Sequence, residues 1–426
     1  MNVFIIHHGY LYSGALTFSY IYRTIDQMML RTSSYVPIIF MLMLPLQSCH
    51  AQPVSNEEKA VKTGAEQTLL YLPKLDEKRI ALFVNQTSII ASVHLADTLL
   101  SLGVNIKKIF APEHGFRGDA GAGEVVQNSV DAKTGIPIIS MYGNHRKPSA
   151  EDLAGIDLLV FDIQDVGVRF YTYISSMSYA MEACARNDIP MLILDRPNPN
   201  GHYIDGPVME PNCISFIGLH AGVPLVYGMT MAEYARMLNG EHWLPDSLHC
   251  TLSWVACQNY RHSTRYSLPV KPSPNLPNMR SVYLYPSLGL FEGTVISTGR
   301  GTDKQFQLLG HPDLLDYPYS FTPEPKPGAP NPKFSGVRCH GLDLSRLDAD
   351  SLYEVAKINL ALIRKLYRDF PDKESFFTSY FYKLAGNYKL QGQIEEGLTA
   401  EEIRLSWQEG LKTFRQIREK YLLYPE

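Results

Sequence analysis

The chain has little charge for its length and no excess of positive charge. Of its 426 residues, 19% are charged, with 39 Lys and Arg against 43 Asp and Glu, whereas soluble domains contain roughly 25% charged residues. Because nucleic-acid binding needs a basic surface to meet the phosphates, we expect no nucleic acid among the partners. The 45% of hydrophobic residues is enough for a large core, so a fibrous or disordered protein is excluded as well.

Cysteine is also scarce, and no known metal or nucleotide motif is present. The six cysteines include no C-x-x-C pair, so neither a zinc site nor a thioredoxin-type site is expected. Cys250 and Cys257 could pair across a hairpin, but buried free thiols are favoured. H-E-x-x-H, G-x-S-x-G, G-x-G-x-x-G and the P-loop are all missing. We therefore expect no metal and no cofactor.

Residues 1–53 are predicted to be an export leader. The apolar run at 36–46 has the length of a signal-peptide core, whereas a membrane-spanning helix needs ~20 residues. The run ends in LQSC, which resembles a lipoprotein cleavage site with a lipid anchor at Cys49. Cleavage after Ala51 is the alternative and would give a soluble periplasmic protein. A further hypothesis is that translation starts at Met29.

The body of the chain alternates short apolar runs with helical segments. The runs are continuously apolar, as strands covered on both faces require, and lie at 79–85, 106–111, 136–142, 158–163 and 190–194. This alternation predicts an α/β fold with a Rossmann-like parallel sheet at 54–210. A smaller mixed α+β domain is expected at 211–426, and it should end in one long helix that begins after Thr399.

Polar clusters follow several of the predicted strands, where parallel sheets bind their ligands. The loop at 111–124 is rich in glycine but lacks a phosphate fingerprint, which indicates a loop shaped around Glu113, His114, Arg117 and Glu124. The alternative is a surface loop whose carboxylates cap a helix.

Two further clusters follow the next strands. Asp165, Arg169, Tyr171 and Tyr173 lie close together in sequence, which is more than a helix cap needs, although one aspartate could serve as a cap. In the loop at 195–207, prolines hold Arg196 and Asn198 in place, as suits a hydroxyl-rich or carboxylate ligand. A structural crossover between domains explains that loop equally well.

The second predicted domain contributes three ionisable candidates. Arg300 stands between two glycines, so its side chain is expected to be exposed for ligand contact. Asp303 follows in the same loop, and Glu292 precedes it. Glu292 is read equally well as a site residue or as a helix-capping carboxylate.

Taken together, these stretches resemble the NamZ family of exo-β-N-acetylmuramidases, formerly a family of unknown function. The matching segments are LFVNQTS, APEHGFRGDAGAGE, TGIPIISMYG, FDIQDVGVRFYTYI, LDRPNPNG, DGPVME, SPNLPN, YPSLGLFEGT and STGRGTD. They run in order from 82 to 303. The resemblance implies an exo-acting glycoside hydrolase that releases N-acetylmuramic acid from the non-reducing end of peptidoglycan fragments. It also implies an active site in the cleft between the two domains.

Glycoside cleavage needs an acid for the leaving oxygen and a second group for the oxocarbenium-like centre. Glu113 is our candidate for the acid. For the second group we consider Glu292 first and then Asp165 or Glu124, and the substrate's own acetamido group is a further alternative. Muramic acid also carries a lactyl carboxylate, which a guanidinium binds in bidentate fashion. The arginines considered for that contact are Arg117, Arg169, Arg196 and Arg300.

Two rival functions stay open at this point. A non-catalytic periplasmic lipoprotein that binds cell-wall sugars would use the same carboxylates as hydrogen-bond acceptors only. A nucleotide-dependent Rossmann enzyme would require a phosphate-binding fingerprint that the sequence lacks. Tyrosine is abundant, with 26 residues, and we expect the tyrosines of the site motifs to pack on sugar faces.

Overall fold

The computed structural model describes residues 59–113, 115–117 and 128–426. The predicted leader with Cys49, and the candidate site residues His114 and Glu124, lie outside the described residues. Residues Glu58–Glu426 form one compact unit. In the described part of the chain, no helix is long and apolar enough to cross a membrane.

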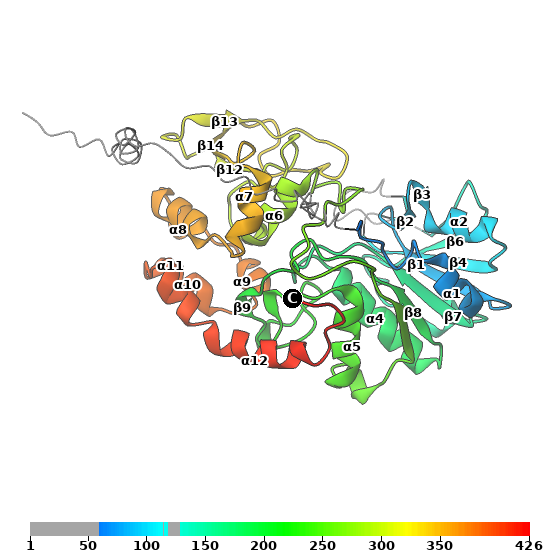
Figure 1. The fold of residues 1–426 in the computed structure, drawn as a ribbon. Coiled ribbons are helices and arrows are strands. Elements are labelled where there is room, and N and C mark those ends of the chain that lie inside the picture. The colour runs from blue at the N-terminus through cyan, green and yellow to red at the C-terminus, as the bar shows by residue number, and fades with distance from the viewer. Residues whose placement is uncertain (1–58, 114, 118–127) are drawn as a thin grey trace, which may run out of the picture. The chain divides into compact units, whose positions relative to one another are not determined.

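A seven-stranded sheet dominates the first half of this unit, as the sequence predicted (Figure 1). Its order is β11-β8-β7-β1-β4-β6-β5, and every pair is parallel except β5 with β6. The strands are β1 (Ile80–Val84), β4 (Ile106–Ala111), β5 (Ser129–Val130), β6 (Pro137–Ser140), β7 (Leu158–Asp162), β8 (Met191–Leu194) and β11 (Leu252–Val255). The five predicted strands are confirmed. β11 comes from beyond residue 210, and the domain boundary expected there stays a prediction.

Helices cover both faces of the sheet, which explains why its strands are apolar throughout. Leu82 and its alternating neighbours pack with α1 (Thr68–Leu75) and α2 (Leu95–Ser101). Phe83 and the other strand residues on the opposite face of the sheet pack with α4 (Tyr173–Arg186) and α5 (Met231–Gly240). The short α3 (Ala150–Leu153) precedes β7. The sheet is therefore sandwiched between two apolar layers, each following one side of the strand pleat.

The rest of the unit is a smaller mixed part with antiparallel strands. β9 (Asp205–Val208) pairs with β10 (Pro224–Val226), and β14 (Cys339–Asp343) lies between β12 (Leu308–His311) and β13 (Tyr319–Phe321). A short hairpin joins β2 (Ile89–Ile90) to β3 (Val93–His94). The helices here are α6 (Met279–Leu288), α7 (Ala349–Val355), α8 (Leu360–Asp369), α9 (Phe381–Ala385), α10 (Lys389–Glu395), α11 (Ala400–Leu405) and α12 (Gln408–Glu419).

The end of the chain differs from the sequence-based prediction of one long helix. Thr399 does form a capping box with Glu402, but the helix ends at Leu405 and α12 begins three residues later. Between them, Ser406 and Trp407 donate backbone hydrogen bonds three residues back along the chain, which tightens the turn and interrupts the helix. Ile403 of α11 and Leu411 and Phe414 of α12 still pack into the core. The cysteines that the structure describes are all buried free thiols, as expected.

Candidate active site

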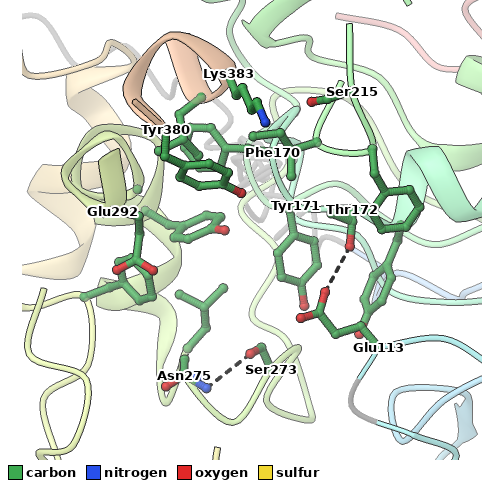
Figure 2. Close-up of a pocket in the computed structure, with 18 of the residues that line it drawn as sticks. Glu113, Phe170, Tyr171, Thr172, Ser215, Ser273, Asn275, Glu292, Tyr380 and Lys383 are labelled. Atoms are coloured by element: carbon green, nitrogen blue, oxygen red, sulfur yellow. Dashed lines mark hydrogen bonds between the residues drawn. The ribbon is translucent and has the colours of Figure 1, made fainter. Parts of the chain in front are cut away.

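One cavity gathers side chains from both halves of the chain. It has a volume of ≈ 400 Å³ and is lined by residues that follow β4, β6 and β7. Its other walls come from α6, the 3₁₀ turn η3 (Gly289–Gly293), α9 and their connecting loops. Of the predicted site residues, the structure brings five to this cavity: Glu113, Tyr171, Tyr173, Glu292 and Arg300. Figure 2 shows Glu113 and Glu292 at opposite sides of it.

Glu113 stands two residues beyond β4, where the chain leaves the sheet. Its Oε2 accepts a hydrogen bond of 3.3 Å from Thr172 Oγ1 (Figure 2). Burial raises the pKa of Tyr142 to about 12, and the neighbouring Glu113 carboxyl, which is hydrogen-bonded to that phenol, adds to the rise. No described Lys, Arg or His forms an ion pair with Glu113. Its partners are therefore neutral hydroxyl groups, which suit a carboxyl group that must gain and release a proton.

Glu292, in η3, has a different environment. Its Oε1 accepts a hydrogen bond of 2.7 Å from Thr298 Oγ1, and its Oε2 lies 3.0 Å from Arg300 Nε. Burial raises the pKa of Glu292, but the positive charge of Arg300, assisted by Lys333, outweighs burial and holds the pKa below its ordinary value. Glu292 is therefore ionised at neutral pH. Because its oxygens face these side chains, the helix-cap interpretation does not describe it.

Aromatic rings form the floor between the two carboxyl groups. Tyr171 meets Tyr173 and Tyr285 edge to face, with ring centroids 4.9 and 5.9 Å apart. Tyr171 donates a hydrogen bond of 2.6 Å to the Pro272 carbonyl, and Tyr173 accepts one of 2.9 Å from Asn85 Nδ2. Burial raises the pKa of all three phenols. They are neutral, firmly held rings of the kind that pack against sugar faces.

Asp165 lies outside the cavity, in the loop after β7. It is buried, and its Oδ2 accepts hydrogen bonds from the Gly167 amide at 2.6 Å and from the Tyr227 hydroxyl. Burial raises the pKa of Asp165 to about 6, although both hydrogen bonds oppose the rise. Asp165 therefore shapes the loop that carries Tyr171. Its position outside the cavity differs from the position expected of a second catalytic group.

Arg169 also differs from the expected ligand-binding role, because its guanidinium faces the protein interior. The side chain is fully buried. Its Nη1 donates to the carbonyls of Pro207 and Val223, at 2.9 and 2.8 Å. Its Nη2 donates to Leu384 and Ala385, at 2.9 and 2.8 Å. Arg169 thus ties the loop after β7 to β9 and α9, and its buried guanidinium does not line the cavity.

Two more predicted residues hold the strand-end loops together. Arg196 pairs with the buried Asp162 through Nε–Oδ1 at 2.5 Å and Nη2–Oδ2 at 2.9 Å. Asn198 donates to the Met229 carbonyl at 2.9 Å and accepts from the Asn200 amide at 2.8 Å. Neither side chain reaches the cavity. The structural-crossover interpretation of this loop therefore fits its geometry.

The last two predicted residues lie at other surfaces. Arg117 pairs with Asp131 at 3.0 Å and with Asp97 at 3.5 Å, outside the cavity. The Asp303 side chain is 91% exposed and pairs with Lys326 at 2.5 Å. Of the four arginines considered for the lactyl carboxylate, only Arg300 lines the cavity, and Glu292 already occupies its Nε. The substrate contacts of all these residues stay predictions.

The cavity residues that sequence reasoning missed include Arg146, Ser215 and Lys383. Arg146 follows the predicted strand at 136–142, so the strand-end rule could have found it. No pattern marks Ser215 or Lys383, because they reach the cavity through contacts between distant parts of the chain. Among the residues that the structure describes, no group of three His, Cys, Asp or Glu could hold a metal ion. The expected absence of a metal stays a prediction.

A cavity with two opposed carboxyl groups and a tyrosine floor is the arrangement of a glycoside hydrolase. The chain belongs to the exo-β-N-acetylmuramidase NamZ family. The family's N-terminal domain matches residues 80–280, and its C-terminal domain matches residues 283–424.

Relatives of known sequence and structure agree with this assignment. The chain is 40% identical over 410 aligned residues to the peptidoglycan β-N-acetylmuramidase NamZ of Bacillus subtilis strain 168, covering 89% of this chain and 96% of that protein. Two crystal structures of DUF1343 family proteins from Bacteroides fragilis share the fold. One has a TM-score of 0.80 and 46% identity, covering 86% of this chain and 99% of the other. The second has a TM-score of 0.72 and 30% identity, covering 85% and 99%.

Proposed function

We propose that this protein is an exo-acting glycoside hydrolase that releases N-acetylmuramic acid from the non-reducing end of peptidoglycan fragments, as part of cell-wall turnover. The observation that carries the proposal is the pair of carboxyl groups in one cavity, in a chain of this family. One of them, Glu292, is held ionised by Arg300. The other, Glu113, accepts its side-chain hydrogen bonds from the hydroxyl groups of Thr172 and Tyr142. Two carboxyl groups in unlike environments are suited to the two roles that glycoside cleavage needs.

In this mechanism Glu113 is the proton donor. It protonates the glycosidic oxygen as the bond to the anomeric carbon breaks, and the leaving sugar departs as a neutral alcohol. Glu292 faces the positive charge that develops at the anomeric carbon and stabilises it as a carboxylate. Water then adds to the anomeric carbon as the hydroxyl group of the released muramic acid, and its other proton returns to the Glu113 carboxylate. The tyrosines between the two carboxyl groups orient the sugar ring.

The test is Glu113→Gln, which keeps the shape of the side chain and removes its acidic proton. We expect a loss of about 10²- to 10⁴-fold in kcat on a muramic acid–glucosamine disaccharide. The loss should be smaller on a dinitrophenyl muramic acid glycoside, because that leaving group needs no proton. Glu401→Gln, an exposed change in α11, is the control and should behave as wild type. Near-wild-type turnover of the disaccharide by a folded Glu113→Gln protein would refute the assignment of Glu113 as the proton donor.

We further propose that the protein is exported, as residues 1–53 suggest, and anchored in a membrane through lipid on Cys49. Mass spectrometry of the mature N-terminus from cells tests both points. A mature chain that begins with a diacylglyceryl Cys49 supports the anchor. A chain that begins after Ala51 supports a soluble exported form, and an uncleaved leader would contradict export.

A further inference from the structure

Two positive charges line the cavity without a carboxylate partner. They are Arg146, in the loop after β6, and Lys383, in α9. Neither forms an ion pair with any residue that the structure describes, whereas Arg300 is paired with Glu292 at 3.0 Å. Three cationic side chains, Arg146, Arg300 and Lys383, therefore line the cavity together with two carboxyl groups, Glu113 and Glu292. The excess of cationic groups favours an anionic ligand.

Arg146 is held in place by an aromatic platform. Its guanidinium carbon lies 4.4 Å from the ring centroid of Phe216, which is itself stacked on Tyr179 of α4 at 5.9 Å and an interplanar angle of 22°. Stacking of this kind holds the guanidinium by its face and leaves its N–H edge available for a planar acceptor. The buried Nε of Arg146 has no hydrogen-bond partner in the described structure. Arg146 is thus oriented but unpaired.

Ser215 and Lys383 line the same cavity as Arg146. Figure 2 shows Ser215 and Lys383 on the same side of the pocket. The buried Ser215 hydroxyl has no hydrogen-bond partner among the described residues, although a buried hydroxyl without one costs free energy. Ser215 and Phe216 are neighbours in sequence, so the hydroxyl and the platform under Arg146 belong to one segment. We call Arg146, Ser215 and Lys383 the anion wall.

We propose that the anion wall binds the lactyl carboxylate of N-acetylmuramic acid and so selects muramic acid over N-acetylglucosamine, which lacks this group. The inference rests on the proposed function, because it takes the muramic acid ring to occupy the cavity. A guanidinium edge, an ammonium group and a hydroxyl group are all donors to a carboxylate, and a planar fork matches its two oxygens. None of its three residues pairs with Glu292 or Glu113 in the described structure, so recognition and bond cleavage use different residues.

The test compares the binding of free N-acetylmuramic acid with that of its lactyl methyl ester by calorimetry. The ester has nearly the same shape but no charge. We expect wild-type protein to bind the acid about 10- to 100-fold more tightly than the ester, as one or two charge-assisted hydrogen bonds would give. Arg146→Met and Lys383→Met should each reduce that preference, and the double variant should abolish it. Arg146→Lys should retain part of it.

Lys389→Met provides the control. Lys389 is an exposed lysine of α10 that pairs with Glu210 at 3.1 Å and does not line the cavity. This variant should keep the full preference for the acid. Equal binding of acid and ester by wild type, or an unchanged preference in the Arg146→Met/Lys383→Met double variant, would overturn the proposal. Because the assay needs no turnover, a protein that prefers the acid but cleaves no glycoside refutes the proposed function and leaves the anion wall supported.

Discussion

Replacing Arg169 by methionine should lower the free energy of unfolding by about 3–5 kcal/mol. The guanidinium donates four hydrogen bonds of 2.8–2.9 Å to backbone carbonyls. Hydrogen bonds to a charged group contribute ~1.5–3 kcal/mol each, or ~6–12 kcal/mol for four. The cost of burying the charge offsets part of this stabilisation. It lowers the pKa of Arg169 from 12.5 to about 9, which corresponds to a cost of roughly 5 kcal/mol. Methionine would restore none of the four hydrogen bonds.

Urea denaturation at pH 7 measures the loss for Arg169→Met. Arg368→Met is a suitable control, because Arg368 is an exposed arginine in α8 whose ion pair with Asp369 lies at the surface. Surface pairs contribute ~0–1 kcal/mol, so this variant should change little. The preference of Arg169→Met for N-acetylmuramic acid over its methyl ester should match wild type. A destabilisation below about 1 kcal/mol, or a lost preference at unchanged stability, would refute the internal role of Arg169.

Two predictions concern pH. The pKa of Asp165 is raised in the folded state from 3.8 to about 6, so its contribution to stability is present below pH ~4 and is lost as the pH rises through 6. The free energy of unfolding of Asp165→Asn, relative to that of wild type, should therefore rise by up to ~3 kcal/mol between pH 4 and pH 7. Urea denaturation at the two pH values measures this change. A difference between variant and wild type that does not vary with pH would contradict it. Arg300→Met removes the charge that holds the pKa of Glu292 down. Activity that needs an ionised Glu292 falls as the pH drops through that pKa, so the acid limb of kcat/KM should move to higher pH by about 1–2 units; an unmoved limb would show that Glu292 does not set it.

The sheet could be predicted because its signal is local. Strands covered on both faces are continuously apolar, and the runs at 80–84 and 158–162 show this directly in the sequence. The strand-end rule then correctly placed Glu113, Tyr171 and Tyr173 at one edge of that sheet. The helix cap at Thr399 was equally readable, since its capping box lies within four consecutive residues.

Structural and ligand-binding arginines could not be distinguished from the sequence, because their roles depend on contacts between distant segments. Arg169 stands in the same polar motif as Tyr171, yet its partner Ala385 lies 216 residues away. No local sequence pattern distinguishes an arginine that binds backbone carbonyls in the interior from an arginine that can bind a ligand. The opposite role of Arg146, which lines the cavity, was equally unpredictable. The ring that orients it, Phe216, comes from a loop beyond β9.

The most direct test of the proposed function is incubation of the purified protein with a disaccharide that carries N-acetylmuramic acid at its non-reducing end, linked to N-acetylglucosamine. Chromatography of the products over time separates an enzyme from a sugar-binding protein. We predict release of free N-acetylmuramic acid and N-acetylglucosamine in equal amounts by wild type, and release about 10²- to 10⁴-fold slower by Glu113→Gln. Recovery of the intact disaccharide, bound to the protein but uncleaved, would contradict the proposed function.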